Sequence, residues 1–144
     1  MAKKLVRRAL EIDEHNFGPN HPNVAKDLNN LAQLLVETKH LTDAEPLLRR
    51  ALEIDEKNLG PNHPDVSIRL NNLAQVLKYT NRLEDAEPLM KRALEIVERS
   101  FGPNHPNIAT CLYNLALLYK ATNHLEKAEP LLKRVAQIDE QNCD

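Results

Sequence analysis

The 144-residue sequence has no tryptophan, and it contains only three tyrosines, two phenylalanines and three glycines. Sandwiches and barrels of β-strands need aromatic and β-branched residues together with frequent glycine turns, so this composition argues against both. Leu, Ala, Glu, Lys, Arg and Gln dominate instead, and these residues favour helices. The sequence therefore predicts an all-α protein.

Other absences narrow the function. The formal net charge is only −2, so no long-range field would attract nucleic acid or an anionic membrane. No apolar run approaches the length of a membrane span, and residues 1–4 lack the apolar segment of a secretory signal. The two cysteines, Cys111 and Cys143, form no CxxC motif. We expect two free thiols in a reducing compartment, the cytoplasm.

A 42-residue repeat is the dominant feature of the sequence. The segment Gly-Pro-Asn-His-Pro begins at Gly18, Gly60 and Gly102, a spacing of 42 residues each time. Residues 25–66 and 67–108 are identical at 25 of 42 positions. Self-similarity at a fixed period indicates one structural unit that is stacked several times.

Each repeat is predicted to contain two helices, because its apolar residues recur with the helical period of 3.6. In the first helix they are Val24, Leu28, Leu31, Ala32 and Leu35. In the second helix they are Ala44, Leu47, Leu48, Ala51 and Leu52. Neither helix buries its apolar stripe alone, so the helices should pack in pairs and the pairs on one another.

The helix ends carry recognisable signals. Pro22 suits the first turn of a helix, where its missing N–H is not needed. Thr42 and Glu45 resemble a capping box at the start of the second helix. Gly60 followed by Pro61 is the expected exit from that helix.

The period divides the chain into a single array of seven helices. Residues 1–17 match the second helix of a repeat alone, and residues 22–59, 64–101 and 106–143 each hold a complete pair. Neither end has the polar outer face expected of a capping repeat. We therefore expect a piece of a longer array, whose uncovered terminal helices permit end-to-end self-association.

The pattern resembles the tetratricopeptide repeat over the whole chain. In that family the first helix carries a spaced Trp, Leu, Gly and Tyr, and here Leu28, Leu31, Ala32 and Leu35 hold these positions. The 42-residue form, with Asn-Asn-Leu-Ala in the first helix and Ala-Leu-Glu-Ile in the second, is similar to kinesin light chain repeats and nephrocystin-like arrays. The resemblance implies an α-solenoid, a right-handed superhelix whose concave groove is lined by the first helices and holds an extended peptide.

The resemblance also implies that asparagine side chains hold the peptide, since a carboxamide both donates and accepts hydrogen bonds. The alternative is that the asparagines link neighbouring helices, and the two roles are compatible. Tyr113 is a better candidate than Tyr79 for an aromatic anchor, because Tyr79 is expected near the helix edge. The candidate groove residues are Lys26, Asn29, Asn30, Gln33, Ile68, Asn71, Asn72, Gln75, Lys78, Tyr113, Asn114 and Leu117.

Nothing in the sequence indicates catalysis, a metal or a cofactor. His21, His63 and His105 recur once per repeat, too far apart for one metal ion, and a structural role at the helix start is expected instead. The basic pairs at residues 49–50 and 91–92 are expected to lie on a solvated face with nearby glutamates.

The function favoured by the sequence is a protein–protein interaction scaffold that binds a protein or peptide segment in its groove. It is predicted not to be an enzyme and to bind neither nucleic acid nor a membrane. The alternative is a structural spacer or self-associating array, of consensus-like or recently duplicated origin, with no specific peptide ligand.

Overall fold

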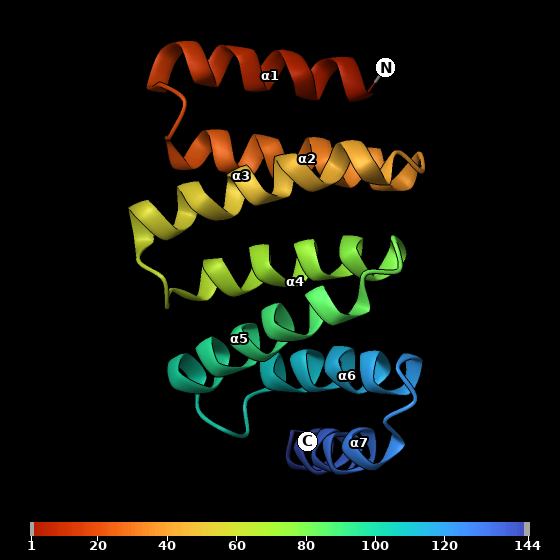
Figure 1. The fold of residues 1–144 in the computed structure, drawn as a ribbon. Coiled ribbons are helices and arrows are strands. Elements are labelled where there is room, and N and C mark those ends of the chain that lie inside the picture. Colours follow the sequence, from red (N-terminus) through yellow and green to blue (C-terminus); the bar gives the residue numbers. More distant parts are fainter. Residues whose placement is uncertain (1, 143–144) are drawn as a thin grey trace.

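A computed structural model describes residues 2–142, which form seven helices and no strand (Figure 1). The helices are α1 (Ala2–Phe17), α2 (Pro22–Glu37), α3 (Leu41–Leu59), α4 (Pro64–Tyr79), α5 (Leu83–Phe101), α6 (Pro106–Ala121) and α7 (Leu125–Gln141). The predicted all-α fold with seven helices is confirmed.

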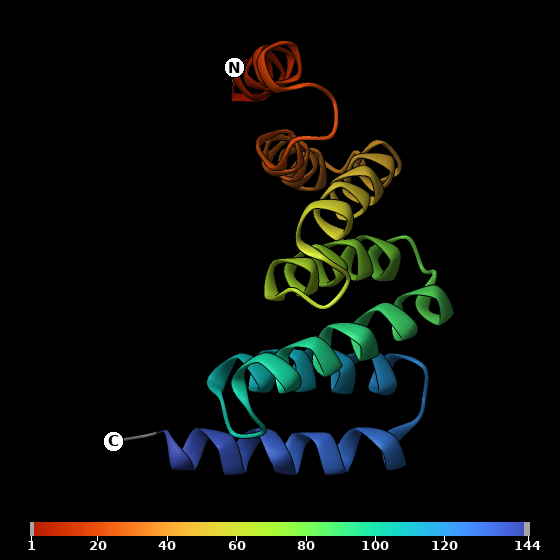
Figure 2. The ribbon, with the colours of Figure 1, turned by 90° about the vertical axis from the view of Figure 1, so that its left-hand side faces the viewer.

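The helices pack in pairs, and the pairs stack in chain order. The tightest packing joins α2 to α3, α4 to α5 and α6 to α7, while α3 to α4 and α5 to α6 connect one pair to the next. Helix α1 packs mainly on α2, and its Glu14 also pairs with Arg50 of α3. The two views show the pairs following one another along one axis, with α1 and α7 at opposite ends (Figures 1 and 2). This arrangement is the predicted α-solenoid.

The turn within each helix pair has the same geometry in all three repeats. One residue in each turn adopts a left-handed conformation: Lys39 with φ 65°, Asn81 with φ 62° and Asn123 with φ 63°. In the first turn, the N–H of His40 donates to the carbonyl of Leu35 at 2.7 Å, and the N–H of Lys39 donates to Val36 at 3.0 Å. These two bonds form a Schellman motif, which satisfies the last carbonyls of the first helix.

The second helix begins directly after this turn, at Leu41. His40 is the N-cap residue, no side chain caps the helix, and Thr42 lies inside the first turn. The predicted capping box of Thr42 and Glu45 is therefore wrong. The Schellman turn leads the chain into the helix one residue before Thr42, so the threonine is not at the capping position.

The connection between repeats follows the predicted signals. Gly60 ends α3 with φ 91° and ψ 158°, a conformation that is essentially restricted to glycine. His63 then precedes α4 in an extended conformation, and its Nδ1 accepts a 3.1 Å hydrogen bond from the N–H of Asp65. His21 and His105 cap α2 and α6 in the same way. The histidines thus have the structural role expected at helix starts.

The core runs between the first and second helices of the array. Alanines occupy the places where helices approach closely, and Ala32, Ala44, Ala74 and Ala86 are completely buried. Helix α1 has no buried residue, and its Leu5 is 70% exposed. The reason is that no first helix packs against this side of α1.

Arginines join successive repeats. Arg92 on α5 donates to the carbonyl of Pro61 at 3.0 Å and to the carboxylate of Glu56 at 3.1 Å. Arg50 and Arg134 make the equivalent pair of bonds in the other repeats. The expectation that both members of each basic pair lie on a solvated face is therefore wrong for Arg50 and Arg92. Stacking brings the end of the preceding second helix and its loop within reach of these side chains.

Candidate peptide-binding groove

The predicted groove residues lie on the first helices α2, α4 and α6, but they differ in exposure. The exposed ones are Lys26, Asn30, Gln33, Ile68 and Tyr113. The half-buried ones are Asn71, Asn72, Gln75, Lys78, Asn114 and Leu117. Asn29 is buried, with only 8% of its surface exposed, so its side chain is not free to contact a ligand.

Three of the asparagines take part in bonds that link neighbouring first helices. Nδ2 of Asn72 on α4 donates a 2.8 Å hydrogen bond to Oδ1 of Asn29 on α2. One junction further, Nδ2 of Asn71 on α4 donates to Sγ of Cys111 on α6 at 3.7 Å. The structural alternative considered for the asparagines therefore holds for Asn29, Asn71 and Asn72. Burial raises the pKa of the Cys111 thiol, so the sulfur in this contact is protonated.

A first pocket of about 270 Å³ lies between α2 and α4. The predicted residues Gln33, Asn72 and Gln75 line it. The structure adds residues that were not among the candidates, namely Val36, Glu37, Leu48, Val76 and Tyr79. Tyr79 is 60% exposed and lines this pocket, whereas Tyr113, the favoured anchor, is 48% exposed and lines neither this pocket nor the second one described below.

A second pocket of about 350 Å³ lies between α4 and α6. Of the predicted residues, Ile68 and Asn71 line it, together with Thr110, Cys111, Val97 and Phe101. Lys26, Asn30, Lys78, Tyr113, Asn114 and Leu117 line neither pocket.

Both pockets open on the same side of α4. The residues of α4 that face them are Ile68, Asn71, Asn72, Gln75 and Tyr79. Ile68, Asn72, Gln75 and Tyr79 are spaced by three or four residues, and Asn71 lies beside Asn72, so all five lie on one side of the helix. We call this face of the first helices, with its two pockets, the groove face. The sequence pattern could identify the face, because these residues lie between the apolar core positions, but it could not show where pockets form.

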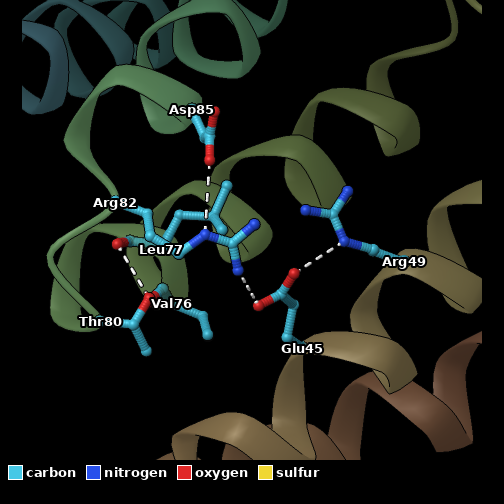
Figure 3. A network of polar contacts seen from close by, with 7 residues as sticks. All are labelled: Glu45, Arg49, Val76, Leu77, Thr80, Arg82 and Asp85. Carbon is cyan, nitrogen blue, oxygen red and sulfur yellow. Dashed lines mark hydrogen bonds and ion pairs between the residues drawn. The ribbon is translucent and has the colours of Figure 1, made fainter.

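A charged network joins the second helices α3 and α5, and its residues line neither pocket. Glu45 on α3 accepts hydrogen bonds from Arg49, one turn on, and from Arg82 at the start of α5 (Figure 3). Arg82 also contacts Asp85 at 3.4 Å. Glu45, which was predicted to belong to a capping box, instead joins two repeats.

The equivalent glutamate in the next repeat makes a similar link. Glu87 on α5 accepts a 3.0 Å hydrogen bond from the hydroxyl of Tyr119 on α6 and pairs with Lys91 at 3.1 Å. The bond from Lys91 is the main cause that lowers the pKa of Glu87.

Within residues 2–142 no group of three or more His, Cys, Asp or Glu side chains is placed to hold a metal ion. In the same part of the chain, no helix has the length and apolar character needed to cross a bilayer. Cys111 is a buried free thiol, and Cys143 lies outside the described residues.

Two solved structures share the fold of this chain over nearly its whole length. BtubC (BKLC) from P. vanneervenii is 26% identical with a TM-score of 0.89, and the match covers 97% of this chain and 56% of that one. A putative kinesin light chain with nearly identical TPR-like repeats from Podospora anserina is 22% identical with a TM-score of 0.86, covering 97% of this chain and 66% of that one.

Aspartyl phosphate phosphatase F from Bacillus subtilis shares the fold at 19% identity and a TM-score of 0.82, with 99% of this chain and 36% of that chain covered. The present chain thus spans less than two thirds of each of these three proteins. A comparison with curated protein sequences finds no match. The family model of the tetratricopeptide repeat matches residues 1–57, 37–98 and 70–141. The chain therefore belongs to the tetratricopeptide repeat family.

Proposed function

We propose that the array is a protein–protein interaction module that binds an extended segment of a partner protein along the groove face. Tetratricopeptide repeats generally mediate interactions between proteins and are generally non-enzymatic scaffolds. In this proposal the array is not an enzyme, and it works in the cytoplasm, where Cys111 stays reduced.

The observation that carries the proposal is the continuous stripe on α4. Ile68 and Asn71 face one pocket, and Asn72, Gln75 and Tyr79 face the other, so a single extended chain could follow the stripe and place one side chain in each pocket. The stripe combines apolar surface with carboxamides, which pair with peptide N–H and C=O groups in either direction. Because Asn71 and Asn72 already hold neighbouring helices, the exposed Gln33 and half-buried Gln75 are the freer carboxamides for a ligand.

Selection from a random peptide library displayed on phage tests the proposal. Selected peptides should bind the unmodified array and lose at least about tenfold in affinity for Gln33→Ala/Gln75→Ala, because two ligand hydrogen bonds of about 1 kcal/mol each are removed. Glu95→Ala, on the exposed side of α5, is the control and should leave affinity unchanged. Circular dichroism should show equal helicity for all three proteins. Selected peptides that bind both variants like the unmodified array would refute the groove assignment.

Self-association is a second candidate function, supported by the exposed Leu5 and Ile12 on α1. Both terminal helices, α1 and α7, are second helices of a repeat. Head-to-tail stacking would place them side by side without the first helix that separates second helices elsewhere in the array. Inside the array, each second helix packs on the first helix of the next repeat, as α3 packs on α4. End-to-end stacking of α7 on α1 would lack this kind of contact. Light scattering over a range of concentrations distinguishes the two functions, since a strictly monomeric array excludes self-association.

A further inference from the structure

The first pocket, between α2 and α4, contains a charge that the fold does not use. Glu37 is exposed in the last turn of α2, and it has no ion-pair partner within the part of the chain that the structure describes. A negative charge at a helix C-terminus is unfavourable, because the helix dipole is negative there. The carboxylate at this position therefore costs stability, and it gains no hydrogen bond or ion pair from residues 2–142 in return.

The corresponding positions of the other first helices differ. Glu37 is replaced by Tyr79 in α4 and by Ala121 in α6, and the adjacent Val36 is replaced by Lys78 and Lys120. An acid at this site is thus specific to the junction of α2 and α4. Lys39 lines an adjacent hollow with Val36 and Tyr79, but it makes no ion pair with Glu37.

The remaining lining suits a long side chain with a cationic end. Val36, Leu48 and Val76 provide apolar surface for an aliphatic stem, and the exposed ring of Tyr79 can receive a cation on its face. Gln33 and Gln75 supply amide oxygens that accept hydrogen bonds. Among the described residues, Glu37 is the only charged one that lines the pocket.

We propose that this pocket binds an arginine side chain of the partner, with the guanidinium between Glu37 and Tyr79. The inference rests on the proposed peptide-binding function and adds the chemistry of one ligand residue. Arginine fits better than lysine, because its planar group stacks on an aromatic ring and makes a two-point contact with a carboxylate. The partner segment is thus expected to place a basic residue, not an acidic one, at the junction of α2 and α4.

Titration with blocked single amino acids, followed by NMR shifts of backbone amides, tests this pocket without any knowledge of the partner. The probes are the N-acetyl, N′-methylamide derivatives of arginine, lysine, norleucine and glutamate. The arginine derivative should shift the amides of Val36, Glu37, Gln75 and Tyr79 and bind about fivefold more tightly than norleucine. Raising the salt concentration to about 0.5 M should remove most of this difference, because exposed charges are then screened.

Glu37→Gln should weaken binding of the arginine derivative about fivefold while it slightly raises the melting temperature, since it removes the unfavourable charge at the end of α2. A residue with a merely structural role would not change binding and stability in opposite directions. Glu53→Gln is the matched control: it makes the same charge change at an exposed position of α3 outside the pocket, and it should leave binding unchanged. Tyr79→Leu should weaken arginine binding and leave norleucine binding nearly the same.

Three results would overturn the inference: equal binding of arginine and norleucine, preference for glutamate, or arginine binding that survives Glu37→Gln. The peptide selection separates this failure from failure of the proposed function. Selected peptides that depend on Gln33 and Gln75 but share no arginine or lysine would overturn the arginine pocket and leave peptide binding intact. Saturable arginine binding without any groove-dependent peptide would support the pocket and overturn the proposed function.

Discussion

Arg69 on α4 donates a 2.7 Å hydrogen bond through Nε to the carboxylate of Asp55 on α3, and the two side chains are only 16% and 4% exposed. This buried ion pair joins the first complete repeat to the second. The repeat places Asp13 and Asp27 at the same two positions of the preceding junction. At the following junction, the positions are held by Val97 and Cys111, which belong to one apolar cluster.

One contact in the array thus exists in three chemical forms: acid with acid, acid with base, and apolar with apolar. The backbone geometry is shared, so differences between the junctions come from the side chains. Each form predicts a different behaviour, and the chain itself supplies the control substitutions.

Arg69→Ala should destabilise the array by about 3 kcal/mol, because it leaves the buried Asp55 without its cation. The double substitution Asp55→Val/Arg69→Cys copies the junction of Val97 and Cys111 and should lie within about 1 kcal/mol of the unmodified protein. Urea denaturation of the three proteins measures both values. A double variant as unstable as Arg69→Ala would contradict the explanation by an uncompensated charge.

The pair of Asp13 and Asp27 should make stability depend on pH. The pKa of Asp27 is raised to about 6, first by burial and then by a hydrogen bond with Asp13 and its charge, while Lys26 acts in the opposite direction. Oδ2 of Asp27 is buried and has no partner among the described residues. Since the folded protein holds this proton more tightly than the unfolded chain, the stabilisation is complete below about pH 4 and is lost as the pH rises through about 6.

Two substitutions isolate this effect from other carboxyl groups. The side chain of Asp27→Asn is neutral at every pH. The free energy of unfolding of this variant, relative to the unmodified protein, should therefore increase by about 1 kcal/mol between pH 4 and pH 7, because partial exposure reduces the effect. Asp27→Arg should form a pair with Asp13 like that of Asp55 and Arg69, and it should be more stable than the unmodified array at pH 7. Parallel profiles of stability against pH for the unmodified protein and Asp27→Asn would contradict the raised pKa of Asp27. Denaturation curves at several pH values provide the measurement.

Lys39→Asn should stabilise the array by about 0.5–1 kcal/mol. Lys39 adopts a positive φ, which is costly for a lysine and easier for asparagine, the residue found at the equivalent positions 81 and 123. Asn81→Lys is the reverse change and should destabilise by a similar amount. Thermal unfolding monitored by circular dichroism compares them, and shifts of the same sign for both substitutions would rule out backbone strain as the cause.

Asn72→Ala should destabilise the protein by about 1 kcal/mol, because it leaves the buried Oδ1 of Asn29 without a donor. Asn30→Ala removes an exposed carboxamide of α2 and should have little effect on stability. Denaturant titrations will show the difference. If both variants are equally stable, the bond between Asn72 and Asn29 contributes nothing to the fold. A loss of partner binding in Asn72→Ala would therefore combine lost stability with lost contact, whereas Gln33 and Gln75 make no such bond between the described helices.

Several features could be predicted from the sequence because their causes are local. The helical period of the apolar residues defines which side of each helix is buried, and Gly60 and Pro64 mark helix ends through their own backbone preferences. The capping box at Thr42 failed because a second local rule, the Schellman turn around Lys39, makes His40 the N-cap residue, two residues earlier than Thr42. No pattern within the repeat revealed that lysine would adopt a left-handed conformation.

The sequence by itself determined the repeat, the number of helices, their buried faces and the family, because these follow from spacing along one chain. Only the tertiary structure decided which partner each polar side chain meets. Asn72 bonds to Asn29, and Arg92 bonds to Pro61 and Glu56, across 31 to 43 residues of chain. It also decided that Tyr79 and Glu37 line one pocket. Such contacts depend on how neighbouring helices are rotated and offset when they stack, and this packing is set by the whole core, not by any single repeat.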